Sequence, residues 1–222
     1  MTTVQIIANV DAAAVCTRSI LRSDQGALLA SMFEDRKRLF VDLLGWEVPI
    51  LAGRYEVDRF DDRAGIYIVA SDETRTHAGS MRLIPTTRPH ILDTLFPFLA
   101  DRDIPVGAGV FEITRLCLPS RFNAAERLSI RNRLITAMVD HALDRGIHTL
   151  TGVVSTSFRD QVLAMGWRAE PLGPACVVNG ASLGAFAIEI DANTPALLRR
   201  TGIYRQVEPQ RTAPVLVAAC AA

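Results

Sequence analysis

The chain has 222 residues, of which 49% are hydrophobic and 22% are charged. This length suffices for one domain with a buried core, and the composition is too apolar for a disordered chain. Basic and acidic side chains balance at 24 each, so no overall charge attracts nucleic acid or an anionic membrane. We expect a single domain over residues 1–222, located in the cytoplasm, with no nucleic-acid or membrane partner.

Cysteine and histidine form no metal-binding or disulfide pattern. The four cysteines are scattered without a Cys-x-x-Cys pair, and the four histidines stand apart. We therefore expect reduced thiols and no metal. Met1–Val10 lacks the basic start of a signal peptide, and the uncharged stretch Pro171–Ile188 is interrupted by proline and glycine, unlike a membrane span.

Apolar periodicity predicts helices and strands along most of the chain. The first helix is expected at 25–44, followed by strands at 54–60, 65–71 and 79–86, a short helix at 91–99, a strand at 110–118, a long helix at 124–145, a strand at 148–155, a helix at 157–165 and a strand at 184–190. This order predicts an α/β fold with a mixed sheet and helices on both faces. The first 20 residues and the tail after Tyr204 have the weakest pattern, and we expect them to be mobile.

Charged residues within apolar strands are the first candidate functional residues. Glu112 and Arg115 interrupt the stretch Val110–Leu118, and Arg82 lies within another predicted strand. Because an unpaired ion in an apolar core is costly, each needs a partner. A structural ion pair is the alternative to a functional one.

Asp58 and Asp61 are a second candidate pair. A spacing of three places them on opposite faces of a regular strand, so a shared site requires a bulge or the strand's end. A solvated strand end is the alternative. Together with Arg36, these charges predict a site for a zwitterionic or carboxylated small molecule, with Phe40 and Trp46 as aromatic walls.

Five short motifs occur in order between Arg36 and Arg115. They are Arg36-x3-Phe40-x5-Trp46, Glu56-x-Asp58-x-Phe60-Asp61, Gly79-x2-Arg82-Leu83-x-Pro85-Thr86, Leu95-Phe96-Pro97 and Phe111-Glu112-x-Thr114-Arg115. In this order and spacing the chain resembles the LuxI-type acyl-homoserine lactone synthases, the autoinducer synthases of bacterial quorum sensing. Thr114 stands where many members have serine.

The resemblance implies both a fold and a reaction. The fold is a three-layer sandwich similar to the GCN5-related N-acetyltransferases, with a mixed central sheet flanked by helices and splayed to admit an acyl chain. Members use S-adenosylmethionine as a substrate, so no cofactor is expected, and take an acyl thioester on acyl carrier protein or coenzyme A. They acylate the methionine amine and then close the lactone, releasing methylthioadenosine.

The alternative is an acyl-CoA-dependent N-acyltransferase of the same fold. That family cradles pyrophosphate with a glycine-rich turn before the central helix. The corresponding link here, Pro119–Ala124, contains no glycine, which counts against this alternative.

The chemistry of this reaction suggests roles for particular residues. Asp58 and Asp61 are expected to hold the cationic substrate, and Arg36, Arg82 and Arg115 to fix the carboxylates. Glu112 is the expected general base for the substrate ammonium, since burial in an apolar strand raises the pKa of a carboxyl. The expected catalytic residues are Glu112, Arg115, Asp58 and Asp61, and the expected substrate-binding residues are Arg36, Phe40, Trp46, Arg82, Phe96, Thr114 and Gly152.

Two further expectations concern the acyl donor. An acidic carrier protein would need a local basic face, for which the candidates are Arg127, Arg131, Arg133, Arg145, Arg159 and Arg168. Gly152 falls where makers of 3-oxo lactones often carry threonine, although a slip of one residue gives Thr151. Because glycine offers no hydroxyl and leaves room, a donor without a 3-oxo group is expected.

Overall fold

The structure, a computed structural model, describes residues 2–15 and 24–205. Its centre is a mixed sheet in the order β1-β4-β5-β6-β7-β10-β8, with β9 also paired to β10. The bounds are β1 Thr3–Ala8, β4 Ile66–Ser71, β5 His77–Pro85, β6 Val110–Cys117, β7 Thr149–Ser155, β8 Arg168–Pro171, β9 Cys176–Val178 and β10 Ala181–Glu189. A small separate sheet pairs β2 (Ile50–Leu51) with β3 (Tyr55–Glu56). The expected mixed sheet is confirmed.

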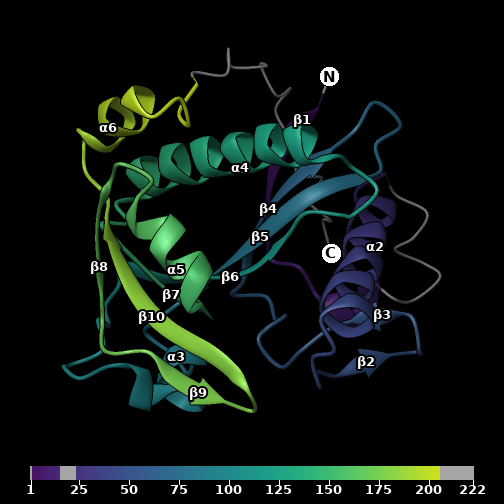
Figure 1. The fold of residues 1–222 in the computed structure, drawn as a ribbon. Coiled ribbons are helices and arrows are strands. Elements are labelled where there is room, and N and C mark those ends of the chain that lie inside the picture. The colour runs from purple at the N-terminus through teal and green to yellow at the C-terminus, as the bar shows by residue number, and fades with distance from the viewer. Residues whose placement is uncertain (1, 16–23, 206–222) are drawn as a thin grey trace, which may run out of the picture.

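Helices cover both faces of this sheet and complete the three layers (Figure 1). On one face, α4 (Ala124–Arg145) and α5 (Thr156–Leu163) pack on the main core, while α6 (Thr194–Arg200) lies against α4. On the other face, α1 (Ala12–Val15) and α2 (Asp24–Arg36) pack on Tyr67 and Val69 of β4. The π-helix η1 (Lys37–Leu43) continues α2, and α3 (Ile91–Leu95) is followed by the 3-10 turn η2 (Pro97–Leu99).

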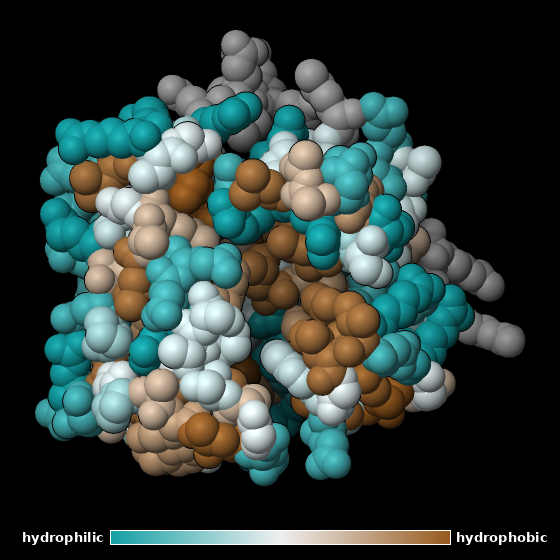
Figure 2. Space-filling view, viewed as in Figure 1, coloured by the Kyte–Doolittle hydropathy of each residue, from teal (hydrophilic) through white to brown (hydrophobic). Residues whose placement is uncertain are grey.

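The sheet opens between β6 and β7, the parallel pair at its centre. Their register pairs run only from Val110–Thr149 to Glu112–Thr151, although both strands continue beyond these residues. Figure 2 shows a hollow at the centre of the side of the molecule in view. It lies between the half with α5 and β10 and the half with α2. The splay expected of the fold is therefore present, and it begins at Glu112.

Local sequence signals explain the elements that were predicted well. The helix predicted at 124–145 is α4, which begins with a reciprocal capping box between Asn123 and Glu126 and ends at Gly146 with φ +67°. The strands predicted at 65–71, 79–86, 110–118, 148–155 and 184–190 are confirmed as β4, β5, β6, β7 and β10.

One expectation was wrong. The strand predicted at 54–60 is only Tyr55–Glu56, and Asp58–Asp61 forms a turn closed by the Asp61 N–H donating to the Asp58 carbonyl at 3.0 Å. Within the N-terminal segment that had the weakest sequence pattern, β1 pairs with β4 from Thr3 to Ala8. The expectation of mobility at 16–20 and after 205 lies outside the described residues. Over the described ranges, no helix is long and apolar enough to cross a membrane.

Candidate active site

Three arginines and three carboxylates form a buried ionic cluster on the α2 face of the sheet. Arg36, in the last turn of α2, donates from both terminal nitrogens to Asp61 at 2.8 Å and from Nε to Glu56 at 2.6 Å. Such a bidentate pair fixes both side chains. The Arg36 side chain is only 1% exposed.

Arg82 joins the two aspartates from the middle of β5. Its terminal nitrogens donate to Asp58 at 2.7 and 2.9 Å, its Nε donates to the Thr114 hydroxyl at 3.0 Å, and it lies 2.5 Å from Asp61. Asp61 also accepts from the Tyr67 hydroxyl at 2.7 Å. Burial alone would raise the pKa of Asp61, but Arg36 and Arg82 hold it far below its ordinary value. The turn brings Asp58 and Asp61 together, so the solvated strand end is ruled out.

Arg115 completes the cluster from a bulge in β6. Between the register pairs Arg82–Thr114 and Ser80–Cys117, β6 has one residue more than β5, and Arg115 has φ +54°. A non-glycine residue in this region is strained, and such strain is concentrated at functional sites. The bulge lets Arg115 donate to Glu56 at 2.9 Å and to Asp58 at 2.7 Å.

An aromatic wall stands over Arg115. Phe40 of η1 stacks on Trp46 with ring centroids 4.7 Å apart, and the Arg115 guanidinium lies 5.5 and 5.8 Å from the two ring centroids. Phe40 is buried, while Trp46 is 45% exposed. The expected wall is therefore assembled at the solvent side of the cluster.

Glu112 lies on the same face of β6 as Thr114, at the point where the sheet opens. Its two carboxylate oxygens accept from the backbone N–H groups of Ile91 and Leu92 at 2.7 and 2.9 Å, at the start of α3. Burial raises the pKa of Glu112 to about 7, although these two hydrogen bonds oppose the shift. A carboxyl poised near neutral pH suits a general base. Phe96, one residue past α3, packs against Ile91 and its neighbours rather than against the ionic cluster.

The surroundings of Gly152 differ from the expectation. A Cβ at Gly152 would lie 2.6 Å from the Phe186 ring, so the ring already fills the expected room. Thr151, the neighbouring residue, pairs in register with Glu112 and is fully buried, and its hydroxyl has no hydrogen-bond partner. The hydroxyl near the groove therefore belongs to Thr151.

The six candidate arginines do not share one basic face. Arg168 binds Glu189 and Asp191, Arg133 donates to the Thr2 carbonyl, and Arg159 is largely buried over Gly184. Arg145 is at the other end of α4 from Arg127 and Arg131. Among the described residues, Arg127 and Arg131 have no carboxylate partner, which leaves these two on the first turns of α4 as a local cationic surface.

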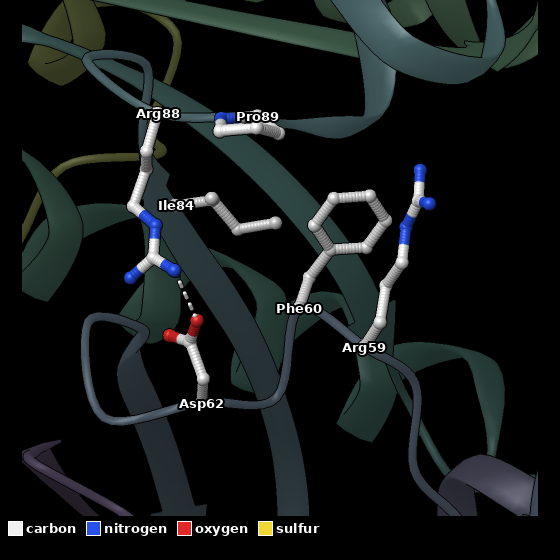
Figure 3. A pocket seen from close by; sticks show the side chains of 6 residues that line it. All are labelled: Arg59, Phe60, Asp62, Ile84, Arg88 and Pro89. Carbon is white, nitrogen blue, oxygen red and sulfur yellow. Dashed lines mark ion pairs between the residues drawn. The ribbon is translucent and has the colours of Figure 1, made fainter.

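A surface pocket adjoins the turn that carries the two aspartates. Figure 3 shows Arg88 and Arg59 on opposite sides of Ile84 and Phe60, with Arg88 reaching Asp62 at 2.7 Å. Arg59 donates to the Thr94 hydroxyl of α3 at 3.1 Å. None of the predicted site residues lines this pocket. Its arginines instead hold the turn against α3 and the 86–90 loop.

Glu56, a member of the ionic cluster, and Tyr67, which donates to Asp61 of the cluster, were not among the predicted site residues. Glu56 is fully buried and bridges Arg36 to Arg115. Glu56 stands in the same motif as Asp58 and Asp61, and this position could have indicated that it belongs to the site. Tyr67 reads locally as an ordinary strand aromatic, because only the tertiary contact to Asp61 shows its role.

The splayed mixed sheet defines the class of fold as that of the GCN5-related acyltransferases. Comparison with similar proteins identifies the family within this fold class. The family model described as autoinducer synthase matches residues 20–196. An acyl-homoserine-lactone synthase of Ralstonia nicotianae is 34% identical over 177 residues, which cover 78% of this chain and 87% of that one.

Solved structures agree with this result. The CoA-dependent acyl-homoserine lactone synthase BjaI, with S-adenosylmethionine and isopentyl-CoA, matches with a TM-score of 0.77 at 25% identity, covering 95% of each chain. TofI, in a complex with an inhibitor and methylthioadenosine, matches with a TM-score of 0.69 at 28% identity, covering 89% of this chain and 96% of that one. The chain belongs to the autoinducer synthase family, the acyl-homoserine-lactone synthases, and is thus an acyltransferase-type enzyme.

Proposed function

We propose that the enzyme transfers an acyl group from a thioester to the amine of S-adenosylmethionine and then closes the homoserine lactone, releasing methylthioadenosine. The observation that carries this proposal is the position of Glu112. A carboxyl with a pKa of about 7 lies at the opening of the sheet, on the same face as the ionic cluster. The acyl group comes from the thioester, and the amine and the carboxylate that form the lactone come from S-adenosylmethionine.

The acceptor binds at the solvent side of the cluster. Asp58 and Arg115 are 8% and 10% exposed, whereas Arg36, Glu56, Asp61 and Arg82 are at most 1% exposed. Asp58 therefore receives the substrate ammonium and Arg115 its carboxylate. The four buried residues hold these two in place. The exposed face of Trp46, stacked on Phe40, lies where it can contact the sulfonium by a cation–π interaction.

The reaction runs in two steps. Glu112 removes a proton from the ammonium, directly or through one water, and the amine nitrogen attacks the thioester carbonyl. The carbon–sulfur bond of the thioester breaks, and the thiolate leaves and takes up a proton. The methionyl carboxylate oxygen then attacks the γ carbon next to the sulfonium, and the bond from that carbon to sulfur breaks to release neutral methylthioadenosine.

The donor lies in the groove between β6 and β7. The groove widens toward the carboxyl ends of these strands, where α4 and α5 begin at Ala124 and Thr156. Backbone N–H groups at helix N-termini favour phosphate, and Arg127 and Arg131 add positive charge there. Both coenzyme A and a carrier-bound pantetheine arm present phosphate, so this end of the groove suits either donor. The BjaI complex with isopentyl-CoA supports a coenzyme A thioester.

The test omits one substrate at a time. Purified enzyme is incubated with S-adenosylmethionine and either acyl-CoA or acyl-carrier protein, and products are identified by mass spectrometry. The proposal predicts an N-acyl-homoserine lactone only when both substrates are present. An N-acylated product that keeps its adenosyl group would instead indicate an N-acyltransferase.

A further inference from the structure

A second buried polar cluster lies on the other side of the last turn of α2. The His77 Nδ1 atom is 2.8 Å from the Asp35 carboxylate, and its Nε2 atom is 3.0 Å from the Ser80 hydroxyl. Arg121, in the link between β6 and α4, donates to both Asp35 oxygens at 2.9 Å and also to the His77 carbonyl. The cluster thus joins α2, β5 and the segment that follows β6.

Burial and the neighbouring charges act in opposite directions on the pKa values of Asp35 and His77. Burial would raise the pKa of Asp35, but His77 and Arg121 lower it to about 2. Burial lowers the pKa of His77 despite its carboxylate partner. The two contacts fit a neutral ring that donates from Nδ1 to Asp35 and accepts the Ser80 hydroxyl proton at Nε2.

The order Ser80–His77–Asp35 matches the connectivity of a nucleophilic triad. Ser80 is 1% exposed and His77 is fully buried, so no substrate reaches the serine oxygen. This burial excludes a hydrolytic role. The cluster instead anchors the last turn of α2.

By anchoring this turn through Asp35, the cluster also fixes the position of Arg36, the next residue in the chain. Successive residues of a helix point about 100° apart, so Asp35 and Arg36 leave the same turn in different directions. Arg36 anchors that turn to Glu56 and Asp61, and Asp35 anchors it to His77 and Arg121. The π-helix η1, which carries Phe40, begins at the next residue.

We propose that Asp35 and His77 are positioning residues for the acceptor substrate. By fixing the end of α2 against β5, they keep Arg36 and the Phe40–Trp46 wall in register with Arg115. This inference rests on the proposed S-adenosylmethionine acceptor. Neither residue lies in the donor groove between β6 and β7. Because Asp35 also holds Arg121, in the link before α4, their loss is expected to have a small effect on the donor and a much larger one on the acceptor.

Matched variants separate this role from a general loss of stability. His77→Asn keeps an N–H donor directed at Asp35, whereas His77→Leu removes it, and Asp35→Asn removes the charge at nearly unchanged volume. Arg38→Gln is the control, because Arg38 also binds Asp35, at 3.0 Å, but from a side chain that is 63% exposed. KM for each substrate and kcat are measured on protein shown to be folded by circular dichroism.

Asp35→Asn and His77→Leu are expected to raise KM for S-adenosylmethionine about ten-fold, the equivalent of one lost buried interaction, with KM for the acyl donor within about two-fold of wild type. His77→Asn and Arg38→Gln should stay near wild type. Unchanged KM for S-adenosylmethionine in Asp35→Asn, or a His77→Asn variant as impaired as His77→Leu, would overturn the inference. If His77→Leu does not fold, Asp35→Asn decides. Failure of the proposed function would appear differently, as a wild-type enzyme that does not consume S-adenosylmethionine.

Discussion

Glu112 combines burial with two backbone hydrogen bonds, which act on its pKa in opposite directions. Burial prevails and raises the pKa to about 7, while Ile91 and Leu92 keep the carboxylate aimed at one place. The sequence singled out Glu112 as the candidate base because a carboxylate within an apolar strand is buried and needs hydrogen-bond partners. It could not predict that the start of α3 supplies the hydrogen bonds, because α3 is distant in the chain.

We predict that Glu112→Gln abolishes acylation and leaves the protein folded. A base must be ionised to accept a proton, so kcat of the wild type should rise with pH through an inflection near 7. The measurement is kcat between pH 5.5 and 9, with circular dichroism as the folding control. Near-normal turnover by Glu112→Gln would exclude Glu112 as the base.

Gly152 leads to a prediction about packing. Because a Cβ there would lie 2.6 Å from the Phe186 ring, Gly152→Ala should destabilise the fold by about 1–3 kcal/mol. The control is Gly107→Ala, whose Cβ would make an ordinary 3.5 Å contact with Val110. Urea unfolding measures both variants. Equal stability of Gly152→Ala and wild type would show that Phe186 moves aside at no cost.

Thr151 leads to a prediction about specificity. Its buried hydroxyl has no partner in the structure, so Thr151→Val should keep or raise the stability by about 1 kcal/mol. Mass spectrometry of lactones from wild type and variant then shows whether a donor oxygen uses this hydroxyl. The expectation of a donor without a 3-oxo group predicts the same lactones from both, and a dominant 3-oxo product would contradict it.

At the scale of elements, the 58–61 turn shows how tertiary contacts override a local pattern. The stretch 54–60 has strand-like composition, yet Asp61 accepts from Arg36, Arg82 and Tyr67, which come from α2, β5 and β4. No window of local sequence contains both Arg36 and Arg82. The regular strands and α4 were predictable because their alternation and caps are local signals.

We predict that Asp61→Asn costs about 3–5 kcal/mol at pH 7, because it leaves buried arginine charge uncompensated. The pKa of Asp61 is lowered, so its contribution is present above the ordinary value of 3.8 and is lost as pH falls below it. The difference from wild type in urea unfolding should therefore narrow at pH 3. The partly exposed neighbour Asp62, paired with Arg88, is the control, and Asp62→Asn should change stability by less than about 0.5 kcal/mol. A constant difference across pH would contradict the assignment.

At the scale of the molecule, the sequence predicted the layers and most residues of the buried ionic cluster. It missed β1, β8 and β9, which are short or lie at the edge of the sheet, where the apolar pattern is weak. It predicted the charged site residues because charge within an apolar strand needs a partner. It could not separate Arg127 and Arg131 from the other arginines, because the acids that neutralise Arg168 come from distant positions.

The donor end of the groove gives a prediction at this scale. Replacing both Arg127 and Arg131 with Gln should raise KM for the acyl donor several-fold and weaken its dependence on salt, with KM for S-adenosylmethionine unchanged. Arg168→Gln is the control, since Glu189 and Asp191 already neutralise Arg168. Donor kinetics at low and high salt provide the measurement. If Arg168→Gln raised KM for the acyl donor equally, Arg127 and Arg131 at the start of α4 would have no specific role in donor binding.

The central claim is that one site acylates S-adenosylmethionine and then closes the lactone. Parallel assays of free thiol from the donor and of methylthioadenosine test it most directly. The account predicts that both appear at the same rate, one to one, only when both substrates are present, and that Glu112→Gln stops both. Thiol release without methylthioadenosine, or methylthioadenosine release without an acyl donor, would contradict it.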